Sequence, residues 1–257
     1  MKKTLIVGNW KMHLDVQASS LLVHRLDKIV KPHRTLEVVL APSMLALQPI
    51  SQEIDRRKFR LAAQNAYYQD EGSFTGEVSF TMLRDLVHYV IVGHSERRLH
   101  FEETLEVVCN KVEAAIRNEI APILCIGETK SERSAGETKR VLHDQLTTAL
   151  ANLTSDEIDR VVIAYEPVWA IGTGDPERPD DIREVLKWIR SIVSDLYGQQ
   201  TATSQRILYG ASVEPEFVAG ILAVEGVDGL LVGHDSLNYQ RFAAIIDAAY
   251  RFQHQEG

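Results

Sequence analysis

The chain of 257 residues is acidic, with a formal net charge of −8, 45% hydrophobic and 25% charged residues. No cluster of lysine and arginine offers a nucleic-acid surface. The two cysteines, Cys109 and Cys125, are too few for a disulfide framework, so we expect a cytoplasmic protein. The apolar run near the N-terminus, residues 5–7, is too short for a signal peptide, and no membrane span is expected.

Short apolar runs alternate with longer amphipathic segments along the chain. Near-continuous apolar runs are typical of strands that are buried on both faces of a parallel sheet. The runs are residues 5–7, 38–41, 61–63, 89–92, 123–126, 161–164, 207–209 and 230–232. No linker rich in Pro, Gly or Ser divides them, so we expect residues 1–257 to form a single domain.

Three segments between these runs show the apolar spacing of helices. Their predicted inward stripes are Leu21, Leu22, Leu26, Ile29 and Val30; Ile182, Val185, Leu186, Ile189, Val193 and Leu196; and Phe242, Ile245, Ile246 and Ala249. Asp180 or Asp181 is expected to cap the second helix, and Gly198 to end it.

The count of strand–helix units selects the fold. Eight units in about 250 residues predict a closed (β/α)₈ TIM barrel of class α/β. An open doubly wound sheet is the alternative, and it needs a glycine-rich phosphate loop after its first strand. Residues 8–11 do not form such a loop, which favours the barrel.

Polar side chains follow six of the predicted strands. In a barrel the carboxyl ends of the strands meet at one rim, which carries the active site. A single polar residue there is usually a cap, but convergence from six strands indicates a site. The residues are Asn9 and Lys11; Gln64 and Asn65; His94, Ser95 and Glu96; Glu128; Glu166; and Ser212.

The segment of residues 164–174 is the most informative of these strand ends. Glu166 directly follows an apolar run, and a stiff Pro-Val-Trp then leads into Gly172-Thr173-Gly174. This order suits a catalytic base beneath a closing loop, whereas a solvated strand-end Glu beside an ordinary turn is the plainer interpretation.

Two late turns can hold a phosphate. Residues 210–212 and 233–236 are rich in small side chains, so they can expose backbone N–H groups. Barrel enzymes commonly bind phosphate after the seventh and eighth strands, beside a helix N-terminus. Without that position in the barrel, the same residues would be two tight turns.

Five motifs of this chain closely resemble the triosephosphate isomerase family, and the likeness runs nearly end to end. They are residues 8–12 (GNWKM), 63–65 (AQN), 93–98 (GHSERR), 125–128 (CIGE) and 164–174 (AYEPVWAIGTG). The resemblance implies an isomerase of glycolysis and gluconeogenesis that interconverts dihydroxyacetone phosphate and D-glyceraldehyde 3-phosphate through an enediolate.

The resemblance also implies roles for individual residues. Glu166 is expected to be the base and His94 the electrophile that polarises the carbonyl. Lys11 would supply positive charge and Asn9 would orient the substrate. The start of a helix after His94 favours a neutral imidazole. The residues expected at the phosphate are Gly172, Ser212, Gly233 and His234.

The supporting residues and partners follow from the same comparison. Cys125 is interpreted as a packing residue behind the site, and Ser95 as a neighbour of the base. Glu96 either lies near Lys11 or is only a carboxylate at a helix start. No histidine spacing suggests a metal, and no cofactor is expected. In the family the loop of residues 70–77 enters a second subunit, which predicts a homodimer contact through Phe74 and Thr75.

Some positions depart from the family pattern near the expected phosphate. Ala211 and His234 replace glycines, and Asp235 would repel a phosphate if it pointed inward. Asp175-Pro176 follows the expected closing loop and would stiffen its end. Two alternatives therefore stay open: an isomerase of another small sugar phosphate, such as a tetrulose phosphate, and a non-catalytic sensor of phosphorylated metabolites.

Overall fold

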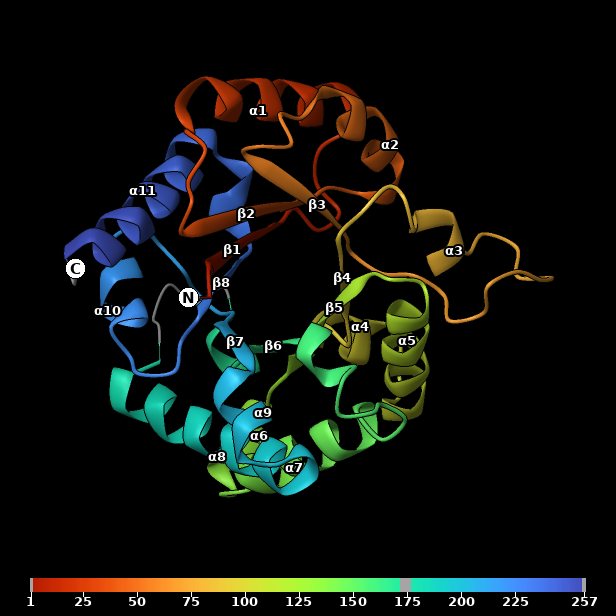
Figure 1. Ribbon diagram of the computed structural model, residues 1–257, viewed down its shortest axis with the longest axis vertical. Helices are drawn as coiled ribbons and strands as arrows, with labels where there is room; N and C mark the ends of the chain where they lie inside the picture. The colour runs from red at the N-terminus through yellow and green to blue at the C-terminus, as the bar shows by residue number, and fades with distance from the viewer. Residues whose placement is uncertain (1, 172–176, 256–257) are drawn as a thin grey trace.

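Eight parallel strands close into a barrel in the computed structural model, which describes residues 2–171 and 177–255 (Figure 1). Each strand pairs with its sequence neighbours, and β8 pairs with β1. The strands are β1 (Thr4–Asn9), β2 (Leu36–Ala41), β3 (Phe59–Ala63), β4 (Tyr89–Val92), β5 (Ala121–Ile126), β6 (Val162–Tyr165), β7 (Arg206–Tyr209) and β8 (Gly229–Val232). The predicted (β/α)₈ barrel is confirmed, and all eight apolar runs lie in strands or overlap them.

Helices surround the strands on the outside of the barrel (Figure 1). The α-helices are α1 (Val16–Ile29), α2 (Met44–Glu53), α3 (Phe80–Leu83), α4 (Ser95–His100), α5 (Leu105–Arg117), α6 (Lys130–Ser134), α7 (Thr138–Ala149), α8 (Pro179–Tyr197), α9 (Gln199–Ser204), α10 (Val218–Leu222) and α11 (Tyr239–Gln255). Three short 3₁₀ turns are η1 (Ile158–Arg160), η2 (Val168–Ala170) and η3 (His234–Leu237). None of the helices in the described ranges has the length and apolar content needed to cross a bilayer.

The strands are apolar throughout because both of their faces are buried. Successive side chains of a strand point to opposite faces, so Leu5 and Val7 fill the barrel interior while Ile6 packs under the helices. On β5, Ile123 and Cys125 likewise face the interior, while Leu124 packs under the helices. Burying each such aliphatic side chain stabilises the fold by roughly 1.5–3 kcal/mol.

The predicted start of α8 is wrong by a few residues. The N-cap is Arg178, Pro179 is the first helical residue, and Asp180 and Asp181 lie inside the first turn. Proline suits this position because the N–H it lacks has no helical partner, and acids favour the positive helix end. The predicted end at Gly198 is confirmed, with a φ of 89° that favours glycine.

Three residues of the predicted inward stripes are exposed instead. Leu196 of α8 and both Leu21 and Ile29 of α1 lie at the edges of their stripes. The remaining members of those two stripes are buried, as is the whole stripe of α11. A helix that packs on a curved barrel contacts it along a narrower face than the sequence pattern suggests.

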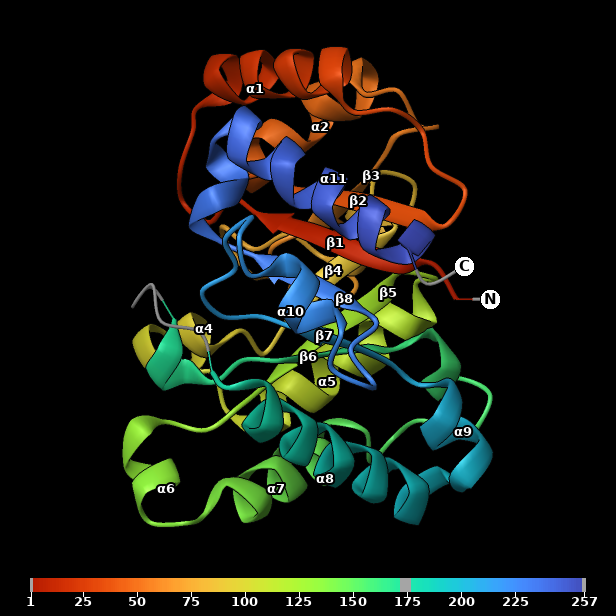
Figure 2. The ribbon, with the colours of Figure 1, turned by 90° about the vertical axis from the view of Figure 1, so that its left-hand side faces the viewer.

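All strands deliver their next residues to the same end of the barrel. Figure 2 shows α4 and α6 at that end, with the start of β1 at the opposite one. The parallel arrangement therefore gathers the residues after β1, β4, β6 and β8 at one rim.

Candidate active site

The carboxylate of Glu166 and the imidazole of His94 meet at this rim. Glu166 follows β6, and its Oε1 lies 3.0 Å from His94 Nε2. Its Oε2 accepts a hydrogen bond from the backbone N–H of Ser95 at 3.2 Å. Glu166 is only 2% exposed and His94 only 6%, so both groups act in a site from which most water is excluded.

The hydrogen bonds of His94 favour the neutral imidazole that the sequence predicts. His94 is the N-cap of α4, and its Nδ1 accepts the backbone N–H of Glu96 at 3.2 Å. A ring nitrogen that accepts carries no proton, so the proton belongs on Nε2, which faces Glu166. Burial lowers the pKa of His94, but the charge and hydrogen bond of Glu166 raise it, and the net direction is upward. Protonation would break the Nδ1 bond, so we assign the neutral form.

Glu166 is held as a carboxylate. Burial raises its pKa, whereas the neighbouring His94, Arg98 and the N–H of Ser95 lower it, and the net direction is downward. A buried carboxylate that keeps its charge is suited to accept a proton from a bound molecule.

Lys11 and Asn9 lie at the end of β1 in a constrained turn. Lys11 has a φ of 51°, which costs of order 1–3 kcal/mol for a residue other than glycine. Its backbone N–H donates to Asn9 Oδ1 at 3.1 Å, and Gln64 Nε2 donates to its carbonyl at 2.8 Å. Its Nζ lies 2.5 Å from Glu96 Oε1. Glu96 therefore fits both interpretations, since it lies in the first turn of α4 and pairs with Lys11.

The two predicted phosphate turns flank this centre. A Cβ at Gly233 would lie 3.9 Å from Lys11 Nζ, so the turn after β8 runs beside that ammonium group. Ser212 Oγ donates to the carbonyl of Ala170 at 2.8 Å, which ties the turn after β7 to the segment after Glu166. His234 is exposed. Gly172, Asp175 and Pro176 lie outside the described residues.

Asp235 is turned toward α11 and has a cationic partner. Its carboxylate Oδ2 lies 2.8 Å from Arg241 Nη2, and the same guanidinium nitrogen lies 3.0 Å from Glu214 Oε2. This ion-pair cluster joins the turn after β7, the turn after β8 and the first turns of α11. The sequence did not predict a role for Arg241, because nothing in the residues around it indicates which carboxylates it pairs with.

Glycine is required at Gly127, and the space for a side chain at Gly210 is tight, both beside Glu166. A Cβ at Gly127 would lie 1.7 Å from the carbonyl oxygen of Glu166, and one at Gly210 would lie 3.3 Å from its Cγ. Gln145 fixes Gly127 through two hydrogen bonds of 2.8 and 3.1 Å to its backbone. The sequence motif pointed to residues 125–128, but the supporting role of Gln145 on α7 has no local signal.

Cys125 lies in the barrel interior below the rim and is 2% exposed. Burial raises the pKa of its thiol well above the usual value, which opposes a nucleophilic role. Its placement agrees with the interpretation as a packing residue.

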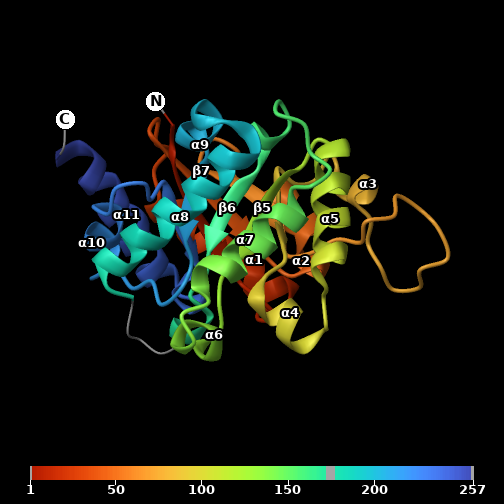
Figure 3. The same cartoon turned by 90° about the horizontal axis from the view of Figure 1, so that it is seen from below.

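The predicted dimer loop projects from the side of the barrel between β3 and α3 (Figure 3). The ring of Phe74 lies 4.7 Å from that of Tyr67, yet the side chain remains 41% exposed. Thr75 is exposed beside it. The loop is thus held in part by its own aromatic contact and presents its tip outward.

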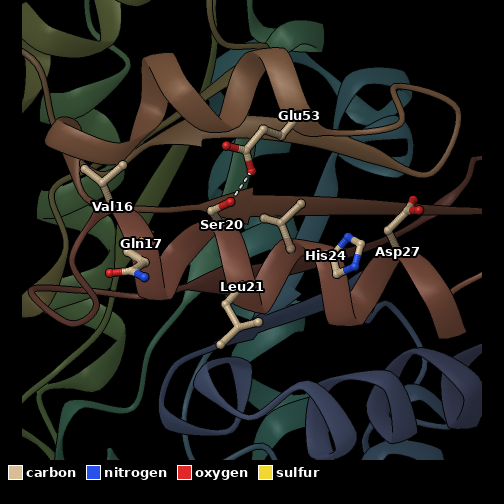
Figure 4. A pocket seen from close by; sticks show the side chains of 8 residues that line it. Val16, Gln17, Ser20, Leu21, His24, Asp27 and Glu53 are labelled. Atoms are coloured by element: carbon tan, nitrogen blue, oxygen red, sulfur yellow. Dashed lines mark hydrogen bonds between the residues drawn. The ribbon is translucent and has the colours of Figure 1, made fainter.

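A cavity of about 510 Å³ adjoins the centre. Asn9, Lys11, His94 and Glu96 line it, together with apolar side chains that include Met12 and Phe101. A larger groove of about 820 Å³ lies on α1 and α2, where Ser20 Oγ donates to Glu53 at 2.5 Å (Figure 4). No strand end contributes to that groove, so the rim is the candidate active site. Among the described residues no group of three or more metal-ligating side chains is suitably placed.

Comparison with known proteins agrees with this geometry. A family model described as triosephosphate isomerase matches residues 4–249. The triosephosphate isomerase of Chloroherpeton thalassium is 44% identical over 97% of this chain and 100% of its own length. Those of Caldanaerobacter subterraneus and Clostridium botulinum are 42% and 41% identical, each over 96% of this chain and 100% of the relative. The chain therefore belongs to the triosephosphate isomerase family.

Proposed function

We propose that this protein interconverts dihydroxyacetone phosphate and D-glyceraldehyde 3-phosphate. The observation that carries the proposal is the buried pair of Glu166 Oε1 and His94 Nε2, 3.0 Å apart, at the rim where Lys11 adds positive charge. No observation favours a longer sugar phosphate as the substrate.

In the proposed reaction Glu166 removes a proton from the carbon beside the carbonyl and returns it to the neighbouring carbon. The electron pair left behind forms an enediolate, so the site must stabilise a developing oxyanion. The Nε2 proton of His94 is the donor for that oxygen, with the ammonium of Lys11 nearby. Asn9 fixes the backbone of Lys11 and orients the substrate. The proton of the substrate's neighbouring hydroxyl must also pass to the former carbonyl oxygen, and Nε2 of His94 is the group proposed to transfer it. With both protons moved, no atom is gained or lost and no cofactor is needed.

The phosphate of the substrate is proposed to bind at the turns after β7 and β8. Backbone N–H groups of Ser212, Gly233 and His234 supply donors there, joined by Gly172. The carboxylate of Asp235 pairs with Arg241 at 2.8 Å, which weakens its repulsion of a phosphate, although Glu214 shares the same guanidinium. The proximity of Gly233 to Lys11 Nζ supports an anion at this end.

We further propose a cytoplasmic homodimer. The loop of residues 70–77 presents Phe74 and Thr75 outward, and the cavity beside Lys11 carries exposed apolar side chains. Met12 is 96% exposed and Phe101 65% exposed, and both line that cavity, so they form exposed apolar surface of the kind that marks an interaction site. The same loop from a second copy would cover them and bring Thr75 close to Lys11.

The decisive experiment measures interconversion of the two triose phosphates by purified protein, with Glu166→Gln as the blank. We expect turnover that the substitution abolishes while a phosphorylated ligand still binds. A folded wild-type protein without turnover would overturn the triose assignment. Sedimentation of the wild type and of a Phe74→Asp, Thr75→Arg variant tests the dimer, and a monomeric wild type would refute it.

A further inference from the structure

Two buried carboxylates share one guanidinium beside the segment that carries Glu166. Arg133 Nη1 lies 3.0 Å from Glu128 Oε1, and its Nη2 lies 2.6 Å from Glu177 Oε1. Glu128 is fully buried and Glu177 only 4% exposed. Within residues 2–171 and 177–255 no other cationic group lies within 4 Å of either carboxylate. The trio carries a net charge of −1 when both acids are ionised, which is costly in a buried site.

The groups that face Glu177 from its other neighbours do not supply the missing charge. Tyr165 on β6 is neutral, and Tyr209 on β7 uses its hydroxyl to accept the backbone N–H of Glu177 at 3.1 Å. Asp181 on α8 adds a further negative charge, since its Oδ2 lies 3.6 Å from Arg133 Nη2 and is also 2.9 Å from Arg178 Nε. Arg133 is thus the one close cation for Glu177 in the described part of the chain.

Burial and the nearby Glu128 and Asp181 raise the pKa of Glu177 to about 7, against the opposing effect of Arg133. Its carboxyl therefore changes protonation in the neutral range, where an ordinary Glu is fully ionised.

The trio contacts the chain on both sides of Glu166. Trp169 Nε1 donates to Glu128 Oε1 at 3.1 Å, and the Tyr165 hydroxyl lies 3.3 Å from both of its carboxylate oxygens. The guanidinium of Arg133 stacks over the Trp169 ring at 4.7 Å from its centroid. A change in how Arg133 divides its contacts must therefore reach residues 165–171.

We propose that Glu177 is a positioning residue whose proton controls how Arg133 is shared between Glu177 and Glu128, and thereby the packing of Trp169 beside the Glu166 segment. When Glu177 loses its proton, the new charge draws Arg133 away from the indole ring and Glu128. The spectroscopic part of this inference is independent of the reaction. Its kinetic part rests on the proposed isomerase function.

The first test is a fluorescence titration of the full chain between pH 5.5 and 8.5. We expect a transition with a midpoint near 7, because a guanidinium that leaves the indole face alters emission. The transition should be absent in Trp169→Phe and in Glu177→Gln. It should remain in Glu184→Gln, a matched change at an exposed acid on α8, the helix that follows Glu177. A transition that persists in Glu177→Gln would overturn the proposal.

The second test is the pH profile of isomerase activity. The amide introduced by Glu177→Gln mimics the protonated acid, so near pH 6 the wild type and this variant should agree within about twofold in kcat/KM. At pH 8 they should diverge by about 2- to 5-fold. Equal profiles in the two proteins would contradict the positioning role, even if the fluorescence transition is lost. An inactive wild type would refute the proposed function but leave the fluorescence result standing.

A further variant guards against a folding defect in Glu177→Gln. Arg133→Lys keeps the positive charge but loses the planar stack and one of the two forked contacts. We expect it to reduce the amplitude of the fluorescence transition and to shift its midpoint. An unchanged transition would show that Arg133 does not transmit the signal.

Discussion

The two halves of the rim hold their side chains in different ways. After β1, β4 and β6 the proposed catalytic groups contact one another directly, as Lys11 does with Glu96 and His94 with Glu166. After β5, β7 and β8 the contacts run through supporting cations, Arg133 and Arg241, which the resemblance did not single out. The first arrangement has little freedom to change without loss of the chemistry. The second arrangement can accept substitutions of its charged residues as long as each acid keeps a cationic partner.

This difference bears on Asp235, which lies beside the proposed phosphate turns. Its repulsion of a phosphate is weakened because Arg241 pairs with it from α11, although the same guanidinium also pairs with Glu214. The departure at Asp235 is therefore one member of an ion-pair cluster and not an isolated change. Substitutions in the two halves should differ in the size and kind of their effect.

The largest effect is expected in the directly bonded half, at His94. His94→Gln removes the Nε2 donor proposed for the oxyanion, and the loss of one such donor lowers kcat by about 10²- to 10³-fold. KM should change little, because the donor acts mainly in the transition state. Steady-state kinetics on both triose phosphates measure this. His24→Gln, at an exposed histidine on α1, is the control and should be neutral. A fall in kcat of less than about fivefold would show that His94 does not donate to the oxyanion as proposed.

The next effect concerns stability in the second half, at Glu177. Its pKa is about 7 in the folded protein and near 4.5 when unfolded, so the folded state holds the proton more tightly. Stability is then fully present below the unfolded pKa and is lost as pH rises toward 7. Because each tenfold change in proton affinity is worth about 1.4 kcal/mol, the loss is on the order of 3 kcal/mol.

Denaturant unfolding of wild type and Glu177→Gln at pH 5 and pH 8, at equal protein concentration, measures this difference. The wild type should lose stability relative to the variant between the two pH values. A wild type whose stability relative to the variant does not change over this range would show that Glu177 is ionised throughout.

The smallest effect is expected at Arg241. Arg241→Gln leaves the carboxylates of Asp235 and Glu214 without their cation near the proposed phosphate turns, so KM should rise by about 3- to 10-fold with little change in kcat. Adding Asp235→Asn should recover most of the loss, since the repelling charge is then gone. Arg251→Gln, at an exposed arginine on the same helix, is the matched control. A fall in kcat without a rise in KM would show that Arg241 supports the catalytic groups and not phosphate binding.

Much of the barrel is determined by the sequence itself. The eight apolar runs and the helical stripes on α8 and α11 are local sequence patterns. A strand that is buried on both faces must be apolar at nearly every position, so it can be seen directly in the sequence. The closed barrel then follows from their number and order. Glu166 and His94 could be recognised as well, because each occupies a strand end with distinctive neighbours.

Only the tertiary structure decided which charges meet. Arg133 and Glu177 are 44 positions apart in the sequence yet form an ion pair. Gln145 bonds to Gly127 from α7, and the sequence around Gln145 does not indicate that contact. The exposure of Leu21 and Leu196 was also set by the curvature of the barrel and not by their spacing. A side chain's partner depends on how strands are closed in space, and ion pairs act over distances in space that sequence separation does not record.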